Sequence, residues 1–344
     1  MEPVTHALTS LALARAGQKH LPRLGTAMLV VAGVAPDLDY ASYLGGASSF
    51  LRFDRTLLHS LPSSALLACA IAGTFWFFTR QRGEHLEKAG ASPAARVRFG
   101  SAFAICAIGI AGHLLLDVVS GVGVQLFWPF RPRWFALDLL TELDPWVLIL
   151  LIAGLLLPML FRLVGEEIGE RKRRGSGTRG AIVTLLLLIA YAGVRGYLHS
   201  NAVDLLESRD YHGRTPLAAG AFPASWSPFE WRGVVSTDNT MEDVDVSLTP
   251  GKEFDPGRSV TSYKPEASAA LEAGQRTVTA QRFLKYARFP LASVVRVEDG
   301  VRIELRDARF PESDSSAANI LARVDMRGNL RVVSEEIQFA SRRR

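Results

Sequence analysis

The sequence predicts a mainly α-helical membrane protein, in which a polytopic bundle of about six helices, two of them short, precedes a small soluble α+β domain with an antiparallel sheet. Two observations favour this class. The chain has 344 residues, of which 48% are hydrophobic. Long apolar runs alternate with short charged loops in its first part, whereas the second part is polar. We therefore expect two modules, residues 1–199 in the membrane and residues 200–344 outside it.

The helical module begins with two short apolar segments, Thr5–Ala16 and Leu24–Ala35. About 12 residues give roughly 18 Å of helix, which is too short to cross a bilayer, so we expect these segments to pack as a hairpin against longer helices. Four later runs have or approach the roughly 20 apolar residues that a membrane span needs. They are Leu61–Thr79, Phe99–Val119, Val147–Val164 and Ala181–Leu198.

The basic residues predict how these helices are oriented. Segments 15–23, 80–98 and 162–180 contain 14 Lys and Arg residues, whereas segments 37–60 and 120–145 contain 4. Basic loops stay on the cytoplasmic side. We therefore expect an integral protein of a bacterial inner membrane, with the two less basic segments and the C-terminal domain on the non-cytoplasmic side. The same rule explains the net charge of +5 without a nucleic-acid partner.

The C-terminal domain shows alternating patterns typical of strands. Strand-like runs occur at Trp231–Ser236 and Asp243–Leu248, and a helical stretch is expected around Pro265–Tyr286. Two hairpins are predicted, one around Asp299-Gly300 and one around residues 327–329. We find no nucleophile motif or metal-ligand cluster in this part of the sequence.

The run Phe99–Val119 contains two residues that do not suit a lipid-facing helix. His113 and Asp117 lie four residues apart in an otherwise apolar stretch, and each costs roughly 3 kcal/mol or more if it faces lipid at the bilayer centre. Positions i and i+4 share a helix face, so the two side chains can reach the same ion. The alternative is a polar pair that only holds two helices together.

Further candidate ligands lie near the same membrane face. Asp37 and Asp39 follow Pro36, and their side chains can point the same way if the backbone is extended there. His59 directly precedes a span, and His6 lies on the first short helix. Taken singly, these are an Asp-rich helix exit and two ordinary capping or interface histidines. The topology nevertheless brings all of the candidates to one face: His6, Asp37, Asp39, His59, His113 and Asp117.

Three histidines and three aspartates form a ligand set suited to a divalent metal, most of all Zn²⁺, with Mn²⁺ or Fe²⁺ as alternatives. Six ligands can hold one ion, or two ions about 3.5–4 Å apart. Such ions activate water for hydrolysis, and one aspartate can then act as general base. We expect Asp37 and Asp39 to serve in this catalytic role as well as in metal binding.

Four spaced motifs resemble the YdjM-like membrane-bound metal-dependent hydrolases. They are the "TH" of "VTHALTS", "APDLD", "RTLLHS" and "GHLLLDVVSGVGVQLFWPF", which together span residues 5 to 130. The resemblance implies the same six metal residues. Asp54 and Tyr40 stand where many members have histidine, which leaves the number and identity of the metals open. The H-x-x-x-D helix is similar to the H-x-x-x-E of zinc phospholipases C and P1-type nucleases, which suggests phosphoester substrates.

The expected function is therefore a metal-dependent hydrolase acting on a lipid-like or phosphoester substrate at the membrane surface. Arg55 and Arg131 are placed to meet an anionic substrate group, or else they snorkel at the interface. Asp144 is a further candidate ligand or an N-terminal helix residue that favours the dipole. "FWPFRPRWF" is typical of a bilayer-surface anchor, so membrane lipids are expected partners. The alternative to a hydrolase is a non-enzymatic transporter or scaffold that binds ions or protons with the same His/Asp cluster. The oligomeric state stays open.

Overall fold

The computed structural model describes residues 1–88, 97–167, 176–224, 226–252, 254–311 and 318–340. The chain forms two compact units. Unit 1 comprises residues 1–39 and 55–196, and unit 2 comprises residues 40–54 and 197–344. Much of the basic linker 162–180 lies outside the described residues.

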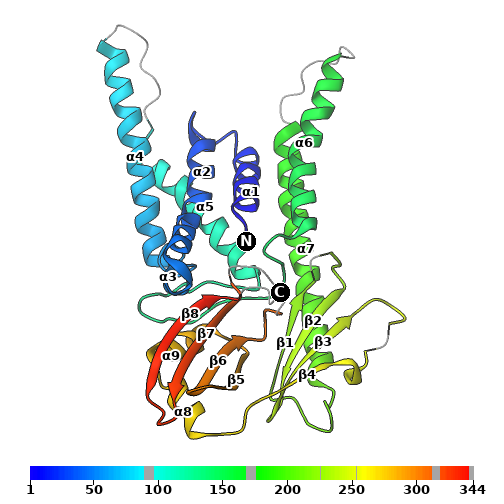
Figure 1. The fold of residues 1–344 in the computed structure, drawn as a ribbon. Coiled ribbons are helices and arrows are strands. Elements are labelled where there is room, and N and C mark those ends of the chain that lie inside the picture. Colours follow the sequence, from blue (N-terminus) through cyan, green and yellow to red (C-terminus); the bar gives the residue numbers. More distant parts are fainter. Residues whose placement is uncertain (89–96, 168–175, 225, 253, 312–317, 341–344) are drawn as a thin grey trace. The chain divides into compact units, whose positions relative to one another are not determined.

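The helices of unit 1 agree with the six that the sequence predicts (Figure 1). Three of them contain stretches long and apolar enough to cross a membrane, namely Leu61–Arg82, Phe99–Val119 and Gly177–Glu207, and a shorter apolar stretch covers Pro145–Phe161. The last turns of the final helix belong to unit 2. The helices are α1 (Pro3–Ala16), α2 (Gly25–Val34), α4 (Leu61–Lys88), α5 (Phe99–Val119), α6 (Pro145–Glu167) and α7 (Ser176–Glu207).

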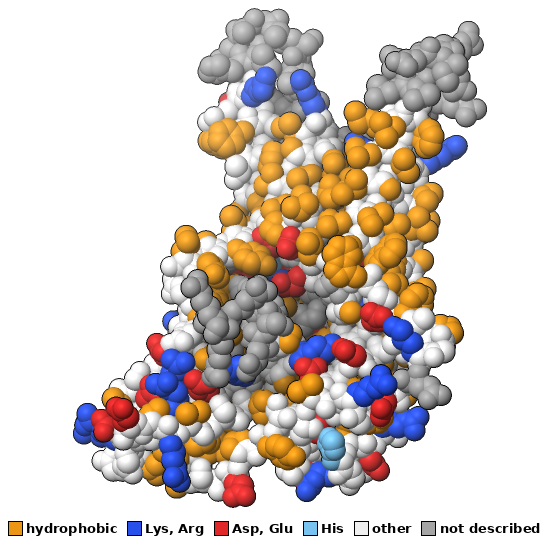
Figure 2. Space-filling model, turned by 45° about the vertical axis from the view of Figure 1, so that its right-hand side comes forward, with side chains coloured by type: hydrophobic (Ala, Val, Ile, Leu, Met, Phe, Trp, Pro, Cys, Tyr) orange, Lys and Arg blue, Asp and Glu red, His pale blue; other side chains and the backbone are white. Residues whose placement is uncertain are grey.

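Exposed apolar side chains cover the long helices on the face drawn in Figure 2. Leu66 is 72% exposed, Phe161 is 73% exposed and Ile189 is 70% exposed. Side chains of this kind are stable when they face hydrocarbon rather than water. This exposure supports the membrane-embedded fold class that the sequence predicts.

Small residues allow α1, α2 and α5 to pack closely, and α4 lies alongside α5 (Figure 1). A Cβ on Gly33 of α2 would lie 1.9 Å from the Ser10 hydroxyl of α1. A Cβ on Gly109 of α5 would lie 2.7 Å from the carbonyl oxygen of Leu29. Only glycine fits at these contacts, and close backbone approach of this kind is how helices associate in membranes.

The connection between α2 and α4 is helical, which the sequence did not indicate. A 3₁₀ helix, η1, covers Ala35–Gly45, and α3 covers Gly46–Phe53. The backbone at Asp37 and Asp39 is therefore helical, and the condition under which alternate side chains point the same way is not met. Pro36 occupies the first turn of η1, where its missing N–H is not needed and its fixed φ suits a helix.

The connection between α5 and α6 folds back on the end of α5. Its backbone N–H at Leu139 bonds the carbonyl of Val119 at 3.0 Å, and an isolated bridge joins Ser120 to Leu140. A second antiparallel bridge joins Val124 to Phe135. We call residues 124–135 the interfacial hairpin.

Unit 2 contains two four-stranded antiparallel sheets, where the sequence predicted one. The first sheet packs on the end of α7, where the side chain of Leu206 fills the space that a Cβ on Gly233 would need. Its order is β1 (Ala218–Pro223), β2 (Glu230–Ser236), β3 (Thr240–Ser247) and β4 (Val260–Tyr263), and the short helix η2 (Pro256–Arg258) precedes β4.

The second sheet confirms both predicted hairpins. Its order is β5 (Pro290–Val297), β6 (Gly300–Asp307), β7 (Ile320–Arg327) and β8 (Val332–Phe339). The predicted helical stretch is divided into α8 (Ala269–Gln275) and α9 (Val278–Tyr286), because Thr277 caps the second helix by accepting from the N–H of Ala280. Both helices pack against this sheet. Charged residues pair in register across its strands, as Arg302 does with Asp325.

Candidate metal centre

Helix α5 supplies the first two side chains of the candidate site. His113 and Asp117 are 2% and 0% exposed. The Nε2 atom of His113 lies 3.1 Å from Oδ2 of Asp117, as the i,i+4 spacing predicts. Their position near the C-terminal end of α5 places them close to one end of a membrane span.

His59, just before α4, completes a tight group of three atoms. Its Nε2 lies 3.0 Å from Nε2 of His113 and 3.1 Å from Oδ2 of Asp117. His59 is 1% exposed. Three potential ligand atoms from two helix ends thus meet at nearly equal distances.

Hydrogen bonds on the far side of each ring fix which nitrogen carries the proton. Nδ1 of His113 lies 2.8 Å from the carbonyl oxygen of Gly33, which can only accept. Nδ1 of His59 lies 2.8 Å from Oδ2 of Asp39. Each Nδ1–H therefore donates, which leaves Nε2 of each ring as the atom that faces the other ring; Nε2 of His59, 3.1 Å from Oδ2 of Asp117, carries a second proton until an ion replaces it. Two lone pairs and a carboxylate oxygen in mutual contact require a cation or a shared proton between them.

Asp37 approaches the same point from η1. Its Oδ1 atom lies 3.8 Å from Nε2 of His113, and Oδ2 has no hydrogen-bond partner among the described residues. Asp37, His59 and His113 form a group whose ligand atoms all lie within 4.8 Å of one another. Tetrahedral ligands about 2.0–2.1 Å from a zinc ion are separated by about 3.3–3.4 Å. The observed spacings are close to this value.

His6 of α1 lies beside this group. Its ring stacks on His113 with the centroids 3.7 Å apart, and its Nε2 lies 3.4 Å from Oδ1 of Asp117. His6, His113 and Asp117 form a second candidate group. Nδ1 of His113 is bonded to Gly33, so both groups depend on the same Nε2. One lone pair binds one ion, and the two groups therefore describe a single centre.

Asp39 lies behind the ring of His59 rather than in either candidate group. Its Oδ2 accepts from Nδ1 of His59 and, at 2.9 Å, from the backbone N–H of Arg55. A carboxylate in this position orients a histidine ligand and raises its basicity.

Arg55 is buried at the centre of the ionic contacts. Nη1 lies 3.2 Å from Oδ1 of Asp117, and Nη2 lies 3.0 Å from Oε1 of Glu142. Its φ of +50° is uncommon for a residue other than glycine, and residues held this way concentrate at functional sites. The amino group of Met1 also contacts Asp117. Glu142 was not anticipated, because its only signal in the sequence is its place in the 120–145 segment.

Burial and neighbouring charges shift the pKa values of this cluster. Burial lowers the pKa of His6 to about 4 and raises the pKa of Asp37 to about 6. Burial also acts to lower the pKa of His59, but its hydrogen bonds to Asp117 and Asp39 outweigh this effect and raise the pKa to about 9. Once His59 has lost its Nε2 proton, three aspartates and Glu142 face the guanidinium of Arg55 and the amino group of Met1. This excess of negative charge favours a bound cation.

Other predicted candidates have structural partners. Asp144 accepts from the N–H groups of Trp146 and Val147 at 3.1 Å each, which confirms its role at the start of α6. Asp54 is the C-terminal cap residue of α3. Asp54 and Tyr40, which replace family histidines, belong to unit 2.

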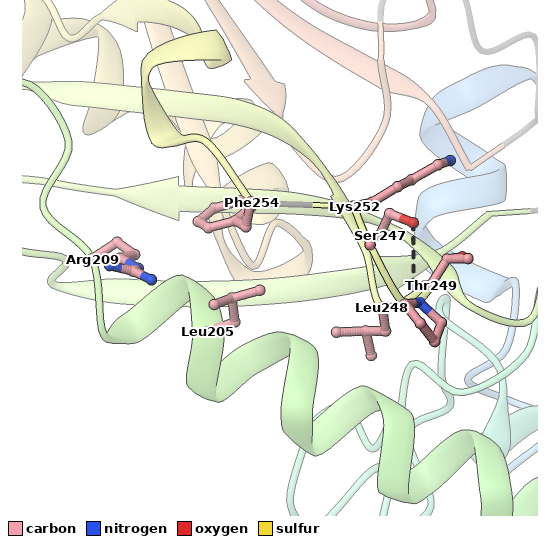
Figure 3. Close-up of a pocket in the computed structure, with 9 residues that line it drawn as sticks. Leu205, Arg209, Ser247, Leu248, Thr249, Lys252 and Phe254 are labelled. Atoms are coloured by element: carbon pink, nitrogen blue, oxygen red, sulfur yellow. Dashed lines mark hydrogen bonds between the residues drawn. The ribbon is translucent and has the colours of Figure 1, made fainter.

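A pocket in unit 2 lies between the end of α7 and the β3–β4 connection (Figure 3). Leu205, Leu248 and Phe254 line it, with Arg209 at one end. None of the described residues that line it is His, Asp, Glu or Cys. The candidate site is therefore the buried cluster of unit 1, whose side chains form groups that could hold a metal ion.

Apolar spanning helices and a buried His/Asp cluster together define a polytopic membrane protein with a candidate metal centre. The model of the YdjM inner membrane protein family matches residues 1–202, which is more than half of the chain. The chain belongs to this family.

The chain is similar to the uncharacterized protein YfhP of Bacillus subtilis (strain 168), with 23% identity over 121 residues. This region covers 35% of the chain and 32% of the relative, so the match spans about a third of each. No solved structure matches the chain.

Proposed function

We propose that the protein is a membrane-bound metal-dependent hydrolase that holds one divalent ion in unit 1. The observation that carries this proposal is the meeting of Nε2 of His59, Nε2 of His113 and Oδ2 of Asp117 within 3.0–3.1 Å. The protonated Nδ1 atoms of both rings are turned away from this point. Nitrogen and oxygen ligands favour Zn²⁺, with Mn²⁺ and Fe²⁺ as alternatives.

The residues have distinct proposed roles. His59, His113 and Asp117 hold the ion, and Asp37 is close enough to join them. His6 contacts the other oxygen of Asp117 and borders the centre. Asp39 orients His59. An ion bound there would polarise the oxygen of the scissile bond and lower the pKa of an attacking water.

Asp37 is the proposed general base. Its Oδ2 atom has no hydrogen-bond partner among the described residues, and its pKa of about 6 lies near the operating range of a cell. Arg55 holds Asp117 and Glu142 at the same time. It can meet an anionic substrate only by exchanging its contact with Glu142, which is the more exposed of the two carboxylates.

The proposed substrate is a lipid-like or phosphoester molecule reached from the bilayer plane. His59 precedes a membrane span and Asp117 lies near the end of another, which favours a reaction at the membrane surface. The guanidinium of Arg55 suits a phosphate oxygen. The charge bias of the loops further supports an inner-membrane location with the site and the C-terminal domain on the non-cytoplasmic side.

Metal content of the purified protein tests the proposal. Native protein should contain about one equivalent of a divalent metal by mass spectrometry, and His113→Ala and Asp37→Ala should contain substantially less. His20→Ala is the matched control, because His20 is exposed and belongs to neither candidate group. Unchanged metal content in both site variants overturns the proposal.

A second measurement separates hydrolysis from the transport alternative. Protein in lipid nanodiscs should release product from a phosphodiester lipid only with metal, and His113→Ala should abolish this release. A transporter would instead carry protons or ions across liposomes without forming product. Metal-dependent ion flux with no hydrolysis of phosphodiesters or carboxylic esters rejects the enzyme.

A further inference from the structure

The interfacial hairpin, residues 124–135, is held in a defined shape. The N–H of Val124 bonds the carbonyl of Phe135 at 3.0 Å, and the reverse bond is 2.9 Å. Nearer the tip, the N–H of Arg131 bonds the carbonyl of Phe127 at 2.9 Å. Gly123 precedes the hairpin with a φ of +78°, and a Cβ there would lie 2.5 Å from the carbonyl oxygen of Phe135. Glycine is thus required where the hairpin closes.

The tip of the hairpin combines exposed aromatic and basic side chains. Phe127 is 43% exposed and Phe130 is 79% exposed. Arg131 and Arg133 are also exposed, and within the described residues neither guanidinium forms an ion pair. No Asp or Glu occurs between Asp117 and Asp138. This surface therefore carries two positive charges without a counter-ion and an apolar ring that water does not favour.

The base of the hairpin is attached to the end of a membrane span. The carbonyl of Leu126 accepts from the N–H of Leu61, the first residue of α4, at 2.9 Å. Four residues from Leu126 to Phe130 reach at most about 13 Å. The headgroup region on each side of the hydrocarbon is about 5–8 Å thick. The tip therefore stays within about 13 Å of the end of this span, a distance comparable to the thickness of the headgroup region.

We infer that the interfacial hairpin is a docking surface for anionic phospholipid headgroups. Arg131 and Arg133 supply the charge, and the apolar ring of Phe130 enters the acyl boundary, as Phe, Trp and Leu side chains do in interfacial segments. Each basic residue near an anionic surface strengthens association by about fivefold, so the pair contributes roughly 25- to 30-fold at low salt. This inference concerns lipid selection and does not depend on the proposed hydrolysis.

The hairpin also contacts the segment that holds the candidate site. The N–H of Gln125 bonds the carbonyl of Arg55 at 3.1 Å. Arg55 in turn contacts Asp39 and Asp117. The base of the hairpin, rather than its tip, therefore lies one hydrogen bond from the residue that makes the ionic contacts of the centre.

A fluorescent reporter on the tip tests the inference. Pro132→Cys, in a Cys69→Ser background that leaves only the buried Cys106, is labelled with a neutral environment-sensitive dye. The protein is placed in nanodiscs of phosphatidylcholine alone or with 30% phosphatidylglycerol, and quenching by acrylamide is measured. We expect quenching to fall at least threefold with phosphatidylglycerol at low salt and to recover in 0.5 M salt, where screening is strong.

Matched variants make the result specific. Arg131→Gln/Arg133→Gln should remove the dependence on phosphatidylglycerol, and Phe130→Ser should weaken protection in both lipids. Arg80→Gln/Arg82→Gln, at the opposite end of α4, should change nothing. Equal quenching in both lipids, or protection that survives loss of Arg131 and Arg133, overturns the inference. Metal content measured on the same samples reports the proposed function separately.

Discussion

Binding of a divalent ion should expel the proton that His59 carries on Nε2, the nitrogen that faces Asp117. The hydrogen bonds to these two carboxylates raise the pKa of His59 to about 9 despite its burial. The ion and the proton compete for the same Nε2 lone pair. Metal affinity must therefore fall as the pH falls.

The pKa values set the size of this effect. At pH 7.5 a group with a pKa of about 9 is roughly 97% protonated, so binding should release about one proton per ion. At pH 6, Asp37, with a pKa of about 6, should add about half a proton. Affinity should rise roughly tenfold per pH unit between 6.5 and 8.5 and level off above pH 9.

Calorimetric titration with Zn²⁺ in buffers of different ionisation enthalpy measures the released protons directly. His59→Gln should bind more weakly and release close to no proton at pH 7.5, whereas His20→Gln should behave as the native protein. Native protein that binds Zn²⁺ with no proton release, or a His59→Gln variant with the native proton count, would refute the reasoning.

Three substitutions test the supporting structure. Asp144→Ala removes the acceptor at the start of α6 and should destabilise the protein by about 1 kcal/mol in thermal unfolding with unchanged metal content; a loss of metal would make Asp144 a ligand. Gly109→Ala forces a Cβ to within 2.7 Å of the carbonyl of Leu29 and should cost about 1–3 kcal/mol. It should also weaken Zn²⁺ binding, because His113 lies one turn away, and native affinity would contradict this. Gly300→Ala places a Cβ 1.9 Å from the carbonyl oxygen of Met326. It should destabilise the second sheet, measured as faster amide hydrogen exchange in its strands, and leave the Zn²⁺ affinity unchanged. Native exchange rates would contradict this prediction.

Much of the fold could be predicted because its signals are local. Apolar runs of spanning length identified the long helices, and alternation around short turns identified both hairpins of the second sheet. The pair of His113 and Asp117 was conspicuous for a physical reason. Ionisable residues in an apolar helix are costly unless they have partners, and the i,i+4 spacing alone places them on one face.

The remainder depends on contacts between distant segments. The sequence predicts Asp39 as another ligand, and only the position of the His59 ring shows that its Oδ2 atom contacts Nδ1. The acceptor for His113 is the backbone carbonyl of Gly33, and since every residue has a carbonyl, no sequence signal could reveal it. Likewise, no alternation or helical period marks η1, which is a short 3₁₀ helix stabilised by local turns.

The candidate ligands come from α1, η1, the turn before α4 and α5, which are separated by up to about a hundred residues of chain. A ligand that binds only the assembled form stabilises it, by about 4 kcal/mol when its free concentration is a thousand times its dissociation constant. An ion at this centre would therefore fasten together segments that enter the bilayer one after another. Loading could occur only after the last of them, α5, had been inserted, so metal occupancy would mark the completion of membrane assembly.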